Sequence, residues 1–227
     1  MAHSTVQTAL AFILFAVICH VTIANPIPTS NMQETYNKYA SLVCEANALS
    51  KWEYKLFLDF KSNRFPNTHE VKIVDVPNLL LTDDMGIFDR IQASDIDLLS
   101  DHRDYLLHYK YIIGYVLADE TNTTSATNFI SDMSSIRLRI SLTIAQLEDV
   151  MIYLGHLSRT QGDIAEASRP YFNPEWEQNV IDRYERDLYV LEQIEMHLTK
   201  AVEDFTSMRN GYIDENTTPV ACAQVLP

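Results

Sequence analysis

Four long segments of this chain carry apolar residues at the 3.6-residue period of an α-helix. Each is about 30 residues long, so each would form a helix of about 45 Å. None has an interior proline, and the 227 residues include only five glycines, which disfavours many short strands joined by tight turns. The sequence therefore predicts an all-α fold. The expected helices cover about residues 32–60, 87–118, 128–156 and 175–208.

The connections between these segments are long, short and long: about 26, nine and 18 residues. A short connection joins antiparallel neighbours, whereas a long one can return along the full length of a helix. Three short loops would be expected for an up-down-up-down bundle. The pattern seen here predicts a long-chain four-helix bundle, up-up-down-down, with two crossover loops.

The N-terminus has the features of a secretory signal. Residues 1–24 contain the apolar run Ala9–Cys19 and end on the small residue Ala24, after which cleavage is expected. The run is too short for a comfortable membrane span, and no second long apolar run follows. We expect a secreted, extracellular protein without membrane insertion, with a helical domain over residues 25–208 and a flexible C-terminal tail over residues 209–227.

Two sequons and a pair of cysteines agree with export. Asn122 and Asn216 each begin an Asn-Thr-Thr sequence, which predicts N-glycosylation at both. Removal of the signal takes Cys19 with it and leaves Cys44 and Cys222, an even pair that suggests a disulfide. Cys44 points away from the apolar stripe of its helix, so it could hold the tail; the alternative is two free thiols.

No catalytic or metal-binding motif is found. The sequence lacks nucleotide-binding glycine loops, a nucleophile elbow and the His and Cys spacings of metal sites. The tripeptide His102–Asp104 imitates part of a kinase loop and is interpreted as a solvated turn of helix. The net charge of −14 disfavours a nucleic-acid partner, which requires a basic surface. We expect no enzyme, no cofactor and no metal.

The third segment is apolar on two sides. Its core stripe includes Ile140, Ile144 and Leu147, but two leucines lie about 160° away from that stripe. A helix that faces one core should be polar there. The second side carries Leu138 and Leu142, flanked by Arg137, Arg139 and Ala145. We interpret it as an interface patch; the alternative is that the first crossover loop or the tail covers it.

Three stretches resemble helices of known cytokines. The first helix of the cardiotrophins is similar to MQETYNKYASLVCEANALSKWEYKLFLDF, and the end of the third helix of ciliary neurotrophic factor is similar to IAQLEDVMIYLGHL. The fourth helix of both is similar to LYVLEQIEMHLTKAVEDF. The chain thus resembles the interleukin-6 family, in the branch of ciliary neurotrophic factor, cardiotrophin-like cytokine and leukaemia inhibitory factor.

The resemblance implies a secreted ligand, a monomer before receptor binding, that assembles glycoprotein 130 with the leukaemia inhibitory factor receptor. An alpha receptor can join this complex, and Janus kinase/STAT signalling follows inside the cell. In the family, the outer faces of the first and third helices form the glycoprotein 130 site. This assigns Lys51 and Lys55 to the same surface as Leu138, Arg139, Leu142 and Ala145.

The family's second receptor site is only partly matched. Its Phe-x-x-Lys motif at the start of the fourth helix aligns here with Ile181 and Tyr184, and Arg183 provides a basic residue only after a shift. Trp176, with Ile181 and Arg183 nearby, is therefore the candidate anchor, and the alternative is that Trp176 caps the core. The rival interpretation of the whole chain is a non-signalling helical bundle that binds a partner helix or a small lipid.

Overall fold

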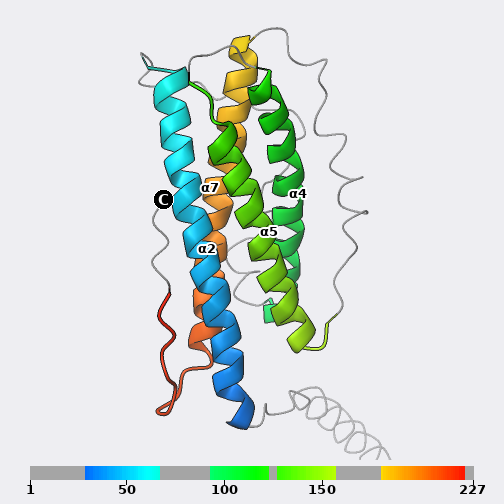
Figure 1. The fold of residues 1–227 in the computed structure, drawn as a ribbon. Helices are drawn as coiled ribbons and strands as arrows, with labels where there is room; N and C mark the ends of the chain where they lie inside the picture. The colour runs from blue at the N-terminus through cyan, green and yellow to red at the C-terminus, as the bar shows by residue number, and fades with distance from the viewer. Residues whose placement is uncertain (1–28, 67–92, 123–126, 157–179, 223–227) are drawn as a thin grey trace, which may run out of the picture.

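The computed structural model describes residues 29–66, 93–122, 127–156 and 180–222, and leaves the side chains of residues 29, 30 and 180–182 undescribed. Four helices form a four-helix bundle, which confirms the predicted fold class (Figure 1). They are α2 (Thr29–Arg64), α4 (Asp95–Thr121), α5 (Ile130–Tyr153) and α7 (Val180–Asn210).

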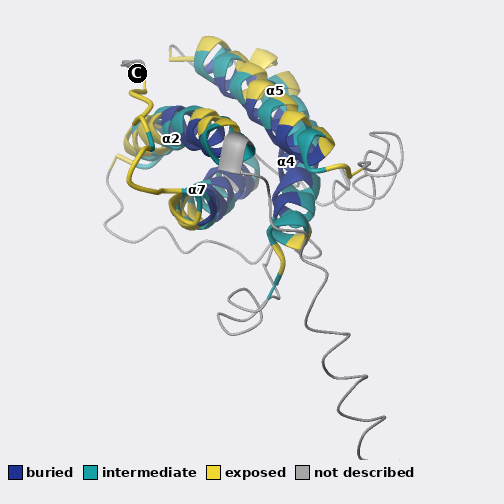
Figure 2. Ribbon diagram, turned by 90° about the horizontal axis from the view of Figure 1, so that it is seen from below, coloured by how far each residue is buried: buried dark blue, intermediate teal, exposed yellow. Residues whose placement is uncertain are grey.

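Contacts at the two ends of the bundle give α2 and α4 the same direction. Near the start of both helices, the Tyr39 hydroxyl donates a hydrogen bond to Asp95, 2.9 Å away. At their far ends, Arg64 of α2 pairs with Glu120 of α4. α2 and α4 do not form one of the main packed pairs, since each packs against α5 and α7. They lie diagonally across the bundle, as the end view shows (Figure 2).

α5 and α7 run in the opposite direction. Lys38, early in α2, pairs with Asp149, late in α5, at 2.7 Å. Asp119, late in α4, pairs with Arg186, early in α7, at 2.6 Å. Figure 1 shows the same directions, two helices up and two down, which is the arrangement that the loop lengths predict. The two long connections themselves lie outside the described residues.

The core lies along the axis of the bundle and is built from the apolar stripes of all four helices. Each helix contributes fully buried side chains at three- and four-residue intervals, as expected for helices that share one core. They include Tyr39, Leu49 and Phe60 of α2, Leu106, Tyr109 and Ile113 of α4, Met133, Ile136 and Ile140 of α5, and Leu191, Leu198 and Phe205 of α7.

The helix ends correct the sequence prediction at several points. α4 was expected to begin near residue 87, but it begins at Asp95, because Ser94 is in an extended conformation and its Oγ accepts a hydrogen bond from the Asp97 amide. α5 ends at Tyr153, and Gly155 then takes the left-handed conformation (φ +83°) common after a helix end. α7 extends to Asn210, two residues beyond the expected boundary.

None of the helices that the structure describes is long and apolar enough to cross a membrane. The predicted signal peptide, residues 1–24, lies outside the described residues.

Candidate interaction surface

The second apolar stripe of α5 is open to solvent. Leu138 is 63% exposed and Leu142 47% exposed, and Ala145 beside them is exposed too. Ile152 continues the stripe two turns further along, with 67% of its surface exposed. Figure 2 shows exposed residues along the side of α5 that faces away from the other helices. The predicted orientation of Leu138 and Leu142 is therefore correct, and an exposed apolar stripe runs along α5.

Arg139 does not lie free at the edge of this stripe, where the sequence analysis expected it. Its guanidinium lies over the Trp52 ring of α2, 4.9 Å from the centroid, and pairs with Glu45 at 3.5 Å. The Arg139 side chain is only 19% exposed. Because both of its partners belong to α2, Arg139 holds α5 against α2 and is not a free cation at the surface.

Lys51 and Lys55 are exposed on the outer face of α2, as predicted. Lys55 pairs with Asp59 one turn later, at 2.7 Å, and this hydrogen bond, together with the negative charge of Asp59, raises the pKa of Lys55. Exposed pairs of this kind contribute little to stability. Both lysines thus remain available to a partner that covers α2 and α5 together.

The C-terminal tail is fixed to the outer face of α2 at two places. Gln33 exchanges two hydrogen bonds with the Thr218 backbone, at 3.2 and 2.8 Å. Cys44, three turns further along α2, forms a disulfide with Cys222, with 5.2 Å between the Cα atoms. Figure 1 shows the tail beside α2. The tail from residue 211 to 222 is therefore anchored, where the sequence predicted flexibility. The suggested disulfide is present, so Cys44 and Cys222 are not free thiols.

The candidate site at the start of the last helix is described only in part. Trp176 and the side chain of Ile181 lie outside the described part of the chain. Arg183 is partly buried, and it lies close enough to the buried Asp187 for the two charges to interact. The described residues therefore do not bring the three predicted contacts into one surface.

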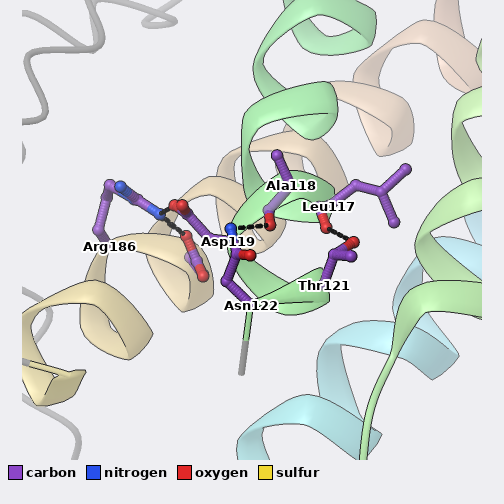
Figure 3. Close-up of polar contacts among 7 residues, drawn as sticks. Leu117, Ala118, Asp119, Thr121, Asn122 and Arg186 are labelled. Carbon is purple, nitrogen blue, oxygen red and sulfur yellow. Dashed lines mark hydrogen bonds and ion pairs between the residues drawn. The ribbon is translucent and has the colours of Figure 1, made fainter. Parts of the chain in front are cut away.

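The two sequons lie at opposite ends of the bundle. Asn122 is the exposed C-cap of α4, with its side-chain amide donating to the Ala118 carbonyl at 3.1 Å (Figure 3). Asn216 is exposed in the tail turn, where Asp214 accepts hydrogen bonds from the Thr217 hydroxyl and the Asn216 amide, both of which lower its pKa. The first site is near the end of α2 and the second near its start. Neither lies on the outer face of α5.

The interface between α4 and α7 contains buried polar side chains that the sequence analysis missed. His102 hydrogen-bonds His197 through Nδ1 (3.2 Å) and Asp204 through Nε2 (2.7 Å), and both histidines are 4% exposed. The prediction of a solvated turn at His102–Asp104 is wrong, because His102 faces α7 and Arg103, 2% exposed, pairs with Glu148 of α5. No motif marks these pairs, since their members come from different helices.

Arg186 forms the second polar cluster between these helices. It bonds to Asp119 of α4 (Figure 3). It also bonds to its neighbour Asp187. Burial raises the pKa of Asp187 to about 7, although the charge of Arg186 and its hydrogen bonds act to lower it. The cluster therefore depends on Arg186, which supplies the charge that compensates a buried carboxyl group.

Glu53 of α2 is buried in the core, and neither carboxylate oxygen has a hydrogen-bond partner in the part of the chain that the structure describes. Burial, and secondarily the charge of Glu195, raises its pKa well above the usual value. Glu53 is therefore a destabilising feature of the core.

Comparisons with known proteins add no identification. No protein-family model matches the chain, and no curated protein matches it. Within the described ranges, no group of three His, Cys, Asp or Glu residues could hold a metal ion.

Proposed function

We propose that this protein is a secreted helical cytokine whose α2–α5 side binds a glycoprotein 130-type receptor. It would assemble that receptor with a leukaemia inhibitory factor receptor type of subunit, with or without an alpha receptor, and so start Janus kinase/STAT signalling. The resemblance of three helices to the interleukin-6 family supports this proposal, as do the directions of the four helices.

The observation that carries the proposal is the exposure of Leu138 and Leu142 on an ordered helix. One exposed leucine is common, but two that are one turn apart on the same face form a small apolar patch. Burial of a leucine side chain is worth about 1.5–3 kcal/mol, so covering both leucines would contribute substantially to the free energy of binding. Lys51 and Lys55 on α2 would give such an interface a polar edge.

The positions of the sequons are consistent with this use of the surface. Glycans on Asn122 and Asn216 would extend from the two ends of the bundle. The outer face of α5, which lies between those ends, would remain accessible to a receptor along its length.

Binding to the soluble extracellular portion of glycoprotein 130 tests the proposal. Leu142→Arg should weaken this binding about 30-fold or more, as expected for an interface hot spot. Met196→Arg is the matched control, because Met196 is 49% exposed on α7, away from α5, while Leu142 is 47% exposed. Both variants should keep the wild-type circular dichroism spectrum and melting temperature, since both positions are on the surface.

Three outcomes would contradict the proposal or part of it, and they are readily separated. If Leu142→Arg binds as tightly as the wild type, the α5 stripe is not the receptor site. If Leu142→Arg unfolds the protein while Met196→Arg does not, the stripe belongs to the core. An absence of binding by the wild-type protein would overturn the proposed function itself.

A further inference from the structure

Gly114, in the middle of α4, lies beside the side chain of Arg137 from α5. Glycine weakens a helix interior relative to alanine, so Gly114 requires a local reason. A Cβ atom at Gly114 would lie 3.5 Å from Cζ and 3.6 Å from Nη2 of Arg137. An alanine would make an ordinary contact there, whereas a longer side chain would compete for the space of the guanidinium. Gly114 therefore leaves a notch in which the Arg137 guanidinium lies against α4.

Arg137 is exposed, and it has no ionic or hydrogen-bonding side-chain partner among the described residues. Lys110, one turn before Gly114 on the same side of α4, likewise has none. Other arginines near this surface are used internally: Arg139 pairs with Glu45, and Arg103 pairs with Glu148. Two uncompensated cations thus lie together where α4 meets α5, in a chain with 31 acidic and 17 basic residues.

Aromatic and apolar side chains flank these cations. Tyr111 and Tyr115 lie on α4, with hydroxyl oxygens 2.7 Å apart and ring centroids 5.1 Å apart in an edge-to-face pair. Tyr111 precedes Gly114 by three residues, which places it on the same side of the helix. On α5, the exposed Leu138 directly follows Arg137. Arginine and tyrosine are the residue types most enriched among interface hot spots.

We propose that Arg137 and Lys110 bind a carboxylate on an acidic segment of the protein partner, with Tyr111 and Leu138 packing around it. The proposal rests on the proposed function and extends it, because it continues the receptor footprint from α5 onto α4. Arg137, and not Arg139, is then the arginine of the interface. The planar guanidinium can hold a carboxylate with two parallel hydrogen bonds, and the notch at Gly114 orients it for that contact.

The charge of the surroundings favours an acidic protein segment over a sulfated polysaccharide. A long polyanion needs a stripe of cations, whereas this site has two. The same helix carries six acidic and two basic residues, including Asp104 about three turns before the notch. A polymer crossing α4 would meet these carboxylates, but a single acidic side chain in a protein loop would not.

Binding of the soluble glycoprotein 130 extracellular portion to four variants tests the inference. Arg137→Glu should weaken binding at least tenfold, and Lys110→Glu should weaken it less, because Arg137 lies in the notch. Lys61→Glu is the matched charge reversal away from α5, where Lys61 lies over the Phe57 ring of α2, and it should bind as the wild type does. Arg137→Gln keeps a polar side chain at this exposed position and guards against a folding defect in Arg137→Glu.

Substitutions at Gly114 separate a binding role from a structural one. Gly114→Ala should raise the melting temperature and leave binding unchanged, because alanine favours the helix and fits beside Arg137. Gly114→Glu should weaken binding at least tenfold, since it offers Arg137 a carboxylate within the protein. A merely structural Arg137 would lower the melting temperature when replaced and would leave the affinity of the folded protein unchanged.

Each result bears on one of the two proposals. If the wild type binds and Arg137→Glu binds equally well, this inference is wrong while the proposed function stands. If the wild type does not bind, the proposed function fails and the inference fails with it. If Arg137→Glu loses retention on immobilised heparin but keeps its receptor affinity, the site serves a sulfated polysaccharide and the inference is also wrong.

Discussion

The interface between α4 and α7 and the interface between α2 and α5 use charged residues in opposite ways. Between α4 and α7, buried polar groups bond across the interface, as His102 does to His197 and Arg186 does to Asp119. Between α2 and α5, the charged contacts lie at the edge and remain partly exposed, as in the pair of Lys38 with Asp149. Polar pairs inside an interface fix which helices meet, whereas polar pairs at its edge leave the outer faces open to a partner.

The distribution of charge follows the same division. α2 and α5 together carry seven basic and seven acidic residues, whereas α4 and α7 carry six basic and thirteen acidic residues. Although the whole chain has a net charge of −14, the side formed by α2 and α5 is neutral, and it carries the exposed leucines of α5. A receptor that approaches the neutral side avoids most of the charge repulsion or desolvation that the acidic side would impose.

Replacement of Arg186 should have the largest effect on stability. Arg186→Ala leaves Asp187 buried without its positive partner, so the free energy of unfolding should fall by about 3–5 kcal/mol. Urea denaturation followed by circular dichroism measures this loss. A loss below 1 kcal/mol would show that the α4–α7 interface does not depend on its buried charges, and the contrast with α2–α5 would disappear.

Replacement of Glu53 should stabilise the protein, by a smaller amount. An acid whose pKa is raised by folding holds its proton longer in the folded state, so stability is highest below the unfolded pKa and falls as pH rises through the folded pKa. Glu53→Gln removes this penalty and should raise the free energy of unfolding by about 1–3 kcal/mol at pH 8. The gain should be smaller at pH 5.

Urea denaturation checks this prediction. Urea denaturation of the wild type and of Glu53→Gln at pH 5 and pH 8 gives the four free energies that are needed. An equal gain at both pH values would mean that Glu53 does not titrate with a raised pKa.

Replacement of Arg139 should have the smallest effect. Arg139→Ala removes a partly exposed ion pair with Glu45 and a cation–π contact with Trp52, so the expected loss is about 1 kcal/mol. The melting temperature reports it, with the Arg186→Ala variant measured in parallel. A loss as large as that of Arg186→Ala would show that both interfaces are held by charge to the same degree.

Local patterns were sufficient to predict the fold and one face of the candidate site. The apolar period identified four long helices, and the loop lengths predicted their directions, because a helix has a fixed rise per residue and a connection must reach the next start. The same period placed Leu138 and Leu142 opposite the core, where the structure has them exposed. The start of α4 was missed, because the apolar period does not reveal the Ser94 cap that begins the helix at Asp95.

The roles of individual charged residues were decided only by the tertiary structure. Arg137 and Arg139 are two residues apart and both flank Leu138 in the sequence, yet Arg139 contacts Glu45 and Trp52 of α2, while Arg137 lies in the Gly114 notch of α4. His102 was predicted to be solvated and is buried against His197, 95 residues away. The helix period defines the direction in which a side chain leaves the helix axis. Which residue it contacts in that direction depends on how distant segments of the chain pack.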